Sequence, residues 1–265
     1  MSDQVRSITR SPLVFIPLEG IPLIQKDDDL VEILLNGLVN NKIQLQDGDV
    51  LVIAQKIVSK AEGRQVNLQT VNPSREASSL AEKTGKDPRI VELILQESNQ
   101  VLRSRPGLII AEHRHGFVCA NAGIDRSNVA GNKDTTDEFV LLLPADPDHS
   151  AKDICGKIMQ ELNVQIGLVI IDSHGRAWRN GTVGISIGFS GIPGIVDFRG
   201  QPDLFDYKLR VTQIAAVDEL AAGASLLMGQ ANEGIPAVHV RGFPYPLREG
   251  SFQEMPRDKR KDLFR

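Results

Sequence analysis

Two kinds of hydrophobic pattern alternate along the chain. Uninterrupted apolar runs, typical of buried strands, occur at 50–54, 108–111, 139–143 and 168–171. Apolar residues at helical spacing occur at 30–38, 74–84, 88–98, 151–162 and 217–228. This succession of strands and helices predicts an α/β protein.

Proline and chain order refine that architecture. Pro17 places a predicted strand at 13–18 on a sheet edge or at a strand end, because proline has no N–H for an inner ladder. A final strand is expected at 235–242. The order strand 139–143, helix 151–162, strand 168–171 predicts a right-handed parallel crossover.

Polar residues mark where helices begin. Three aspartates at 27–29 precede the helical segment 30–38, and negative charge is favourable at a helix N-terminus. We therefore interpret them as a cap and not as a metal cluster. Pro73 and Pro88 stand beside capping residues and predict two further helix starts.

The stretch 167–192 combines reactive and flexible residues. Its apolar run ends in Asp172 and Ser173, at an edge where open α/β sheets usually bind ligands. The residues that follow include Gly175, Arg176, Trp178, Arg179, Gly181, Gly184, Gly188 and Gly191. Two interpretations stay open: a strand, a turn and a glycine-rich second strand, or a metal or phosphate site centred on Asp172.

Asp125 is the second aspartate that follows an apolar strand among small residues. Together with Asp172 it supplies carboxylate oxygens of the kind that Mg²⁺ prefers. Lys56 and Lys60 share one face if 55–64 is helical, and that face is either solvated or a phosphate clamp. The parts for metal-assisted phosphoryl transfer are thus present, although the chain carries no P-loop, GxGxxG, GxSxG or HExxH motif.

Four other residues have weaker signals. His113 and His115 lie two positions apart, and a partly exposed turn is preferred to a metal pair. Cys119 is expected to be a small core residue. Trp178 is either a stacking surface for a flat ring or a packed anchor.

Composition narrows the classes of protein. The 265 residues suit one large unit with a real core, and the polar loop 130–137 and the link 192–206 are the plausible boundaries of two subdomains. The net charge of −4 argues against nucleic-acid binding. Two isolated cysteines, no apolar run of about 20 residues and no signal segment predict a cytoplasmic protein without membrane contact.

Several blocks, in this order, resemble the coenzyme F420-0:L-glutamate ligase family, the γ-glutamyl ligases. The resemblance extends from about residue 12 to 245. It rests on segment 48–64, Asn-Ala-Gly-Ile-Asp (121–125) with 127–129, Asp-Ser-His-Gly-Arg (172–176) with Arg179, Gly181, Gly184, Ile187, Gly188, Ser190 and Gly191, segment 218–229, and Glu-Gly-Ile-Pro-Ala-Val (233–238) with 241–242.

The resemblance implies a reaction and a fold. Such enzymes use GTP to activate a terminal carboxylate of the deazaflavin precursor F420-0 as an acyl phosphate, which the amine of L-glutamate displaces. Similar enzymes add further γ-linked glutamates. The family requires Mg²⁺ or Mn²⁺, is stimulated by K⁺, and has a mixed α+β fold, with mixed sheets and flanking helices, that forms intertwined homodimers.

The resemblance also assigns residues by position. It implies one metal at Asp125 and Asp172, and a second at Ser173 and Gln230, where glutamate is common in the family. The segments matching the GTP contacts are Ile21, Pro22, Leu23, Ile24, Gln55, Lys56, Lys60, Asn128, Gly229, Gln230, Ala231, Asn232, Glu233, Gly234, Ile235 and Pro236. Some members have a small hydroxyl pair in place of Gln55 and Lys56.

Two alternatives remain at this point. One is a related nucleotide-dependent amide ligase that acts on another acid or amine. The other is a non-enzymatic protein that kept the fold, which the Asp125, Asp172 and Ser173 set disfavours. The glycines after Trp178 serve either close packing or substrate approach.

Overall fold

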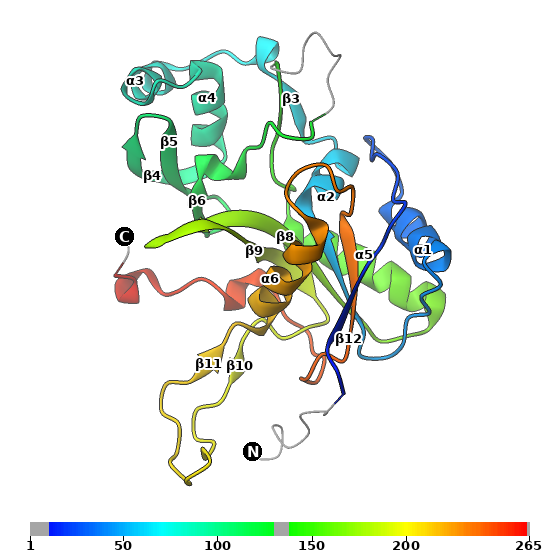
Figure 1. The fold of residues 1–265 in the computed structure, drawn as a ribbon. Coiled ribbons are helices and arrows are strands. Elements are labelled where there is room, and N and C mark those ends of the chain that lie inside the picture. The colour runs from blue at the N-terminus through cyan, green and yellow to red at the C-terminus, as the bar shows by residue number, and fades with distance from the viewer. Residues whose placement is uncertain (1–10, 130–137, 264–265) are drawn as a thin grey trace.

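A five-stranded sheet forms the centre of the molecule (Figure 1). The computed structural model describes residues 11–129 and 138–263. The strands lie in the order β1 (Val14–Pro17), β12 (Ala237–Arg241), β2 (Val50–Ala54), β8 (Gly167–Arg176) and β9 (Arg179–Ser190). Only β2 and β8 pair in parallel. The sheet is therefore mixed, and β1 lies at its edge, as Pro17 predicted.

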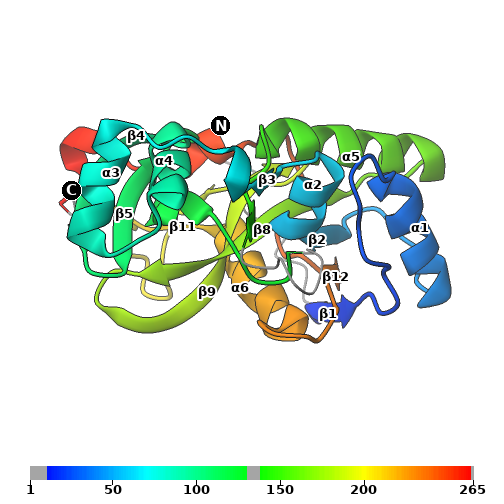
Figure 2. The same ribbon diagram turned by 90° about the horizontal axis from the view of Figure 1, so that it is seen from above.

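Helices cover both faces of this sheet. Helices α1 (Leu30–Asn40) and α5 (Pro147–Leu162) lie on one side and α6 (Ala216–Met228) on the other (Figure 2). The short helix α2 (Gln55–Ala61) follows β2 directly. Residues 50–53 and 168–170 have no exposed surface, which explains their uninterrupted apolar sequence.

A smaller lobe has its own hydrophobic cluster. It contains α3 (Arg75–Thr84), α4 (Pro88–Gln96) and an antiparallel sheet of β4 (Ser98–Arg105), β5 (Leu108–His113) and β6 (Val118–Ala120). Figure 1 shows it beside the long β8–β9 hairpin. The division into subdomains stays a prediction, and the proposed boundary at 130–137 lies outside the described residues.

The predicted crossover from 139–143 to 168–171 is wrong. Strand β7 (Phe139–Leu141) pairs antiparallel with β3 (Gln65–Asn67) in a separate sheet, and the parallel neighbour of β8 is β2. Arg64 continues this pairing, because its C=O accepts from the N–H of Leu142 and its side chain donates to the C=O of Leu143. The crossover rule applies only to strands of one sheet.

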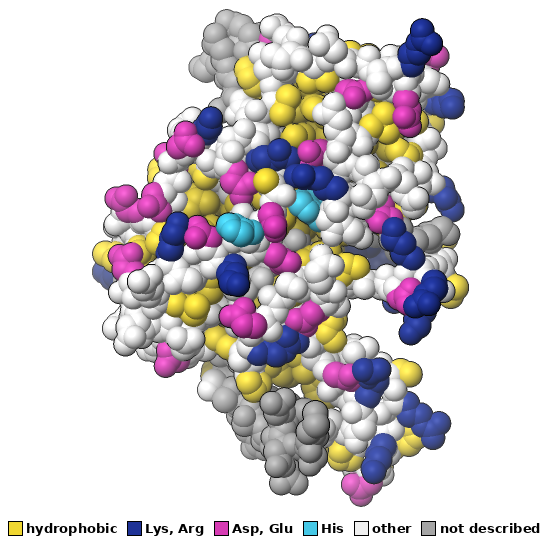
Figure 3. All heavy atoms as spheres, turned by 180° about the vertical axis from the view of Figure 1, so that it is seen from behind, with side chains coloured by type: hydrophobic (Ala, Val, Ile, Leu, Met, Phe, Trp, Pro, Cys, Tyr) yellow, Lys and Arg dark blue, Asp and Glu magenta, His cyan; other side chains and the backbone are white. Residues whose placement is uncertain are grey.

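The link at 192–206 is part of a projecting arm. Strands β10 (Val196–Asp197) and β11 (Gln213–Ile214) pair antiparallel at its base. The arm extends away from the body, and Figure 3 shows basic side chains on it, with acidic and basic groups intermixed over the rest of that face. Helix α6 begins only at Ala216, so the undecided segment 207–216 is mainly the returning half of the arm.

Helix starts largely follow the predicted capping. Asp29 caps α1 and Asp87 caps α4, with Pro88 inside the first turn. Ser74 caps α3, so Pro73 lies outside that helix. Helix α5 begins at Pro147 and not near residue 151, because proline lacks only an N–H that has no partner in the first turn.

His113 departs from its prediction. Its side chain has no exposed surface, whereas a partly exposed turn was expected. Burial is the main cause that lowers its pKa. The ring stacks on Phe117, a member of the central hydrophobic cluster, with centroids 4.9 Å apart, so this histidine packs where the smaller lobe meets the central core.

Candidate functional site

A cavity of about 570 Å³ opens where the parallel pair of β2 and β8 ends. The last paired residues are Ala54 and Ile171, so Asp172 stands one position beyond the pair. Its lining comprises Ile21, Pro22, Leu23, Ile24, Gln25, Ala54, Gln55, Lys56, Ile57, Lys60, Asn128, Val129, Ile171, Asp172, Ser173, Ser225, Met228, Gly229, Gln230, Ala231, Asn232, Glu233, Gly234, Ile235 and Pro236. Carboxyl ends of parallel strands are the usual ligand sites of such sheets.

All of the residues matched to GTP contacts therefore line one cavity, although they come from five separate segments of the chain. Of those matched to metals, Asp172, Ser173 and Gln230 line it as well. Asp125 does not, but it forms an ion pair with a lining residue, Lys56. The structure thus gathers the predicted set, while the role of each residue stays a prediction.

Neither aspartate ends a strand, contrary to prediction. Strand β8 continues past Asp172 to Arg176, because β9 pairs with it along this length. Asp125 follows the short 3₁₀ helix η2 (Asn121–Gly123) and forms an isolated bridge with Leu141. Asp172 still lies at the edge of the sheet where the parallel strands end, because β2 ends beside it.

Gly184 and Gly188 of β9 serve close packing. A Cβ on Gly184 would lie 2.6 Å from the C=O oxygen of Ala221 in α6. A Cβ on Gly188 would lie 2.4 Å from the carbonyl carbon of Pro147 in α5. These two glycines let helices approach both faces of β9, which decides between the two interpretations for them.

Lys56, Asp125 and Ser127 form a compact polar cluster at one side of the cavity. The Nζ of Lys56 lies 2.7 Å from Oδ2 of Asp125 and donates to Oγ of Ser127 at 2.8 Å. Both the N–H and the hydroxyl of Ser127 donate to Oδ1 of Asp125. Burial raises the pKa of Asp125, but the bonds from Lys56 and Ser127 outweigh it and the pKa is lowered. The carboxylate is therefore held ionised.

Lys60 lies one helical turn beyond Lys56 on α2. Burial, and then the charge of Lys56, lower its pKa. Within residues 11–129 and 138–263, no carboxylate lies within ion-pair distance of its ammonium. Of the two neighbouring cations, only Lys56 has a carboxylate partner, so positive charge is left to offset, which favours an anionic ligand.

The loop 229–236 lines the cavity and is hydrogen-bonded to Asn128 and Ser173. Asn128 donates to the C=O of Ala231 at 3.0 Å, and Ser173 donates to Oε1 of Gln230 at 2.9 Å. The Glu233 carboxylate accepts from the N–H of Ala231. Backbone hydrogen bonds from Ala231, Glu233 and Gln230 lower its pKa. These N–H groups converge on an anion, as phosphate-binding backbone does.

The donors around the cavity fit a hard divalent cation. Asp125 and Asp172 supply carboxylate oxygens, Ser173 a hydroxyl and Gln230 an amide oxygen, which are ligands typical of Mg²⁺ and Mn²⁺. Strand β6 packs against β8, and burial, followed by the charge of Asp172, raises the pKa of the Cys119 thiol. Within the described ranges, however, no three His, Cys, Asp or Glu side chains are grouped so as to hold a metal.

The residues at the tip of the β8–β9 hairpin do not join the site. Arg176, Trp178 and Arg179 are absent from the lining of the cavity. Trp178 is 89% exposed, which contradicts a packed anchor in this chain. Cys119 is a buried core residue as predicted, and its pKa of about 12 keeps the thiol protonated.

The structure adds one neighbour that the sequence analysis missed. His174 is buried, and its Nε2 lies 3.0 Å from Oδ2 of Asp172. Residues two apart on a strand share a face, so the continued strand could have indicated this pair. The prediction that β8 ended at Asp172 concealed it.

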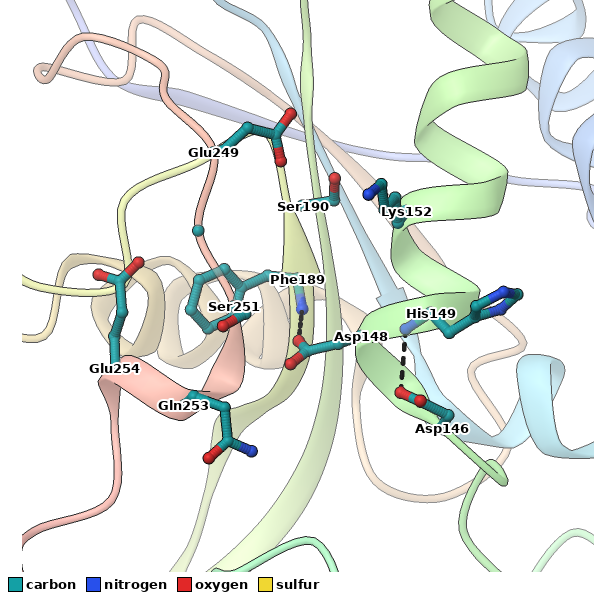
Figure 4. Close-up of a pocket in the computed structure, with 11 residues that line it drawn as sticks. Asp146, Asp148, His149, Lys152, Phe189, Ser190, Glu249, Ser251, Gln253 and Glu254 are labelled. Carbon is teal, nitrogen blue, oxygen red and sulfur yellow. Dashed lines mark hydrogen bonds between the residues drawn. The ribbon is translucent and has the colours of Figure 1, made fainter.

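A second cavity, of about 580 Å³, has a different character (Figure 4). It lies where the start of α5 meets β9 and the C-terminal segment, and contains none of the predicted site residues. The Asp148 carboxylate accepts from the N–H groups of Phe189 and Phe252, and Asp146 accepts from that of His149. These two acids are used to fix backbone.

Comparison with known proteins agrees with the resemblance. Residues 20–242 match the sequence model of the F420-0:gamma-glutamyl ligase family. Coenzyme F420:L-glutamate ligases of Methanothermobacter thermautotrophicus and Methanopyrus kandleri are 44% and 43% identical, each over 94% of this chain and 98% and 97% of their own lengths. The same-named protein of Archaeoglobus fulgidus is 41% identical over 94% of this chain and 95% of its own. The chain therefore belongs to the F420-0:gamma-glutamyl ligase family of enzymes.

Proposed function

We propose that this protein is a GTP-dependent ligase that adds L-glutamate to coenzyme F420-0. The observation that carries the proposal is the convergence of the matched segments on one cavity at the end of β2 and β8. Lys56, Lys60, Asp172, Ser173 and Gln230 line this cavity, and Asp125 is ion-paired with Lys56. Family membership supports the ligase chemistry and the kind of substrate.

The proposed reaction has two steps. A carboxylate oxygen of F420-0 takes the γ-phosphoryl group of GTP, the bond to the β-phosphate oxygen breaks, and GDP leaves. The amine of L-glutamate then attacks the carbonyl carbon of the acyl phosphate and loses a proton, and phosphate leaves as the amide forms. No protein nucleophile is required, which agrees with the protonated thiol of Cys119.

The residues of the cavity have separate parts in this scheme. Lys60 and Lys56 offset charge on the phosphates, and the N–H groups of loop 229–236 orient them by exchanging the Glu233 carboxylate, which they hold in this structure, for a phosphate. Asn128 fixes that loop through Ala231. Such fixed charges and donors are the main means by which phosphoryl transfer is catalysed.

We propose that Asp125 and Asp172 hold one Mg²⁺ or Mn²⁺, and that Ser173 and Gln230 hold a second. A bound divalent cation would supply charge stabilisation at the transferred phosphoryl oxygens. Metal binding at Asp125 would require Lys56 to give up its present ion pair, which leaves that ammonium available to a phosphate. Stimulation by K⁺ belongs to the same proposal.

We further propose a homodimer, with the arm between β10 and β11 as part of its interface. The arm exposes Leu204, Phe205 and Val211 almost completely, at 97%, 89% and 85%. Exposed apolar groups gathered on a projection are typical of an interaction surface.

Both cysteines are free and buried, in keeping with a reducing cytoplasm. Among the helices of the described residues, none has the length and apolar character of a membrane span.

A single assay tests the reaction. Purified protein with GTP, Mn²⁺, L-glutamate and F420-0 is expected to release GDP and to yield a product heavier by one or more glutamyl residues. Reactions with ATP in place of GTP, or without L-glutamate, are the controls. Absence of GDP release above background would refute the proposal, and turnover with a different acid or amine alone would favour a related amide ligase.

A further inference from the structure

His174 is the buried neighbour of the proposed metal ligand Asp172. The two side chains lie on the same face of β8, and Nε2 of His174 is 3.0 Å from Oδ2 of Asp172. We propose that His174 is a positioning residue that orients the Asp172 carboxylate toward its metal. This inference rests on the proposed function, because it presumes that Asp172 binds a metal.

The direction of the hydrogen bond follows from the chemistry of the two groups. An ionised carboxylate can only accept, so Nε2 of His174 carries the proton and donates. The side chains of His174 and Asp172 are only 6% and 13% exposed, so water competes little for this bond. One oxygen of Asp172 is therefore tied to a fixed N–H, while the residue also lines the cavity.

The ring of His174 is held by aromatic packing. Phe117 lies against it with centroids 5.4 Å apart and the planes tilted by 54°. Phe117 is fixed in turn by an edge contact with Phe252 and by stacking on His113. The N–H that meets Asp172 thus comes from a ring with little freedom to turn.

The two proposed ligand carboxylates are supported differently. Asp125 is met by the long, flexible Lys56 side chain, which is 26% exposed and can exchange its partner. Asp172 instead accepts a hydrogen bond from the His174 ring, which is 6% exposed and packs against Phe117. Outer partners that fix a ligand carboxylate typically change metal affinity or activity by about 10- to 100-fold when they are removed. The structure therefore assigns orientation of the metal ligand to His174.

The experiment compares Mn²⁺ binding, followed by electron paramagnetic resonance, in matched variants. His174→Phe keeps a flat ring but removes the donor, and we expect its affinity for Mn²⁺ to fall about 10- to 100-fold. His174→Gln places an amide N–H near the position of Nε2 and should restore most of the affinity. His174→Asn, whose amide reaches only the position of Nδ1, should not. Chemical unfolding of each variant controls for loss of structure.

The outcomes separate this inference from the proposed function. Affinity of His174→Phe equal to that of the wild type overturns the inference, as does equal binding by the Gln and Asn variants. If His174→Phe does not fold, the Gln and Asn pair decides alone. Asp172→Asn supplies the reference: if it binds Mn²⁺ as tightly as the wild type, the metal assignment fails first, and the role of His174 fails with it.

In turnover, a positioning role predicts a higher Mn²⁺ requirement for His174→Phe, with the apparent KM for L-glutamate unchanged. Saturating Mn²⁺ should recover most of kcat. A purely structural role would instead lower the unfolding stability and reduce the active fraction at every Mn²⁺ concentration.

Discussion

The charged groups at the two ends of strand β2 differ in whether their partners lie within the protein. At its start, the Asp49 carboxylate is 2% exposed and accepts from both Arg241 and His239 of β12. Beyond its end, Lys56 is shared between Asp125 and Ser127, and Lys60 faces the cavity. Removing one partner from a buried, fully paired network is costly, because the other charges are left unpaired, whereas charges that face a cavity are available to a ligand.

The same contrast distinguishes the two cavities. Around the second one, Asp148 is occupied by the N–H groups of Phe189 and Phe252. In the first cavity, the hydroxyl of Ser173 donates to the side-chain amide of Gln230, and within the described residues neither group has another side-chain hydrogen bond. The two cavities thus have similar volumes but different chemistry. Polar atoms bonded to the protein backbone indicate a structural junction, whereas polar atoms with few protein partners indicate a ligand site.

Asp49→Ala gives the largest expected effect on stability. It leaves buried His239 and part-buried Arg241 without their carboxylate, so the free energy of unfolding should fall by about 3 kcal/mol. Chemical denaturation measures this. The specific activity of the remaining folded protein should be close to normal, and a selective loss of turnover at full stability would break the distinction between the two ends.

Asp172→Asn should have the reverse profile. Loss of the carboxylate charge removes a proposed metal ligand, so kcat should fall on the order of 100- to 1,000-fold. The free energy of unfolding should change by less than about 1 kcal/mol, because the amide oxygen can still accept from His174. Unchanged metal-dependent turnover would remove Asp172 from the site.

Acid should lower the stability of the fold through Asp49, at the start of β2. Burial raises the pKa of Asp49, but hydrogen bonds from Arg241, His239 and Gln46 outweigh it, and the pKa falls to about 2. A carboxylate with a lowered pKa stabilises the fold above its unfolded value of 3.8, and this stabilisation is lost as the pH falls toward 2. Asp49 should thus contribute about 2 kcal/mol to the acid sensitivity of unfolding. In an Asp49→Asn variant, an acid sensitivity equal to that of the wild type would contradict this assignment.

Lys60→Ala gives the smallest predicted effect. Removing one of two cations beside the phosphates should weaken GTP binding about tenfold, as measured by calorimetry. Lys157→Ala is the matched control, because Lys157 is exposed and paired with Asp153 on α5. Equal affinities in both variants would mean that Lys60 faces solvent and not a phosphate.

Local patterns predicted much of the fold. The continuous apolar runs gave β2 and β8, Pro17 gave the edge strand, and Asp29 gave a helix cap, since each depends on interactions within a few residues or on complete burial. The pairing of β7 with β3 and the arm at β10 and β11 were missed. Both are set by tertiary partners that leave no periodic signal.

The site divides in the same way. Residue types alone indicated Asp125, Asp172, Lys56 and Lys60, but the assembly of segments 21–24 and 229–236 around them came from family resemblance. The His174 contact was missed because β8 continues beyond the end of its parallel partner. That continuation depends only on pairing with β9, whose partner residues lie at most thirteen positions further along the chain, as Ile185 does from Asp172.

The most direct measurement is a crystal structure of the protein with GDP and Mn²⁺. We expect GDP in the cavity at the end of β2 and β8, with its phosphates beside Lys60 and loop 229–236. We also expect Mn²⁺ on Asp172, with His174 still donating to that carboxylate. GDP in the cavity lined by Asp146 and Asp148, or Mn²⁺ bound elsewhere while Asp172 carries none, would contradict these expectations.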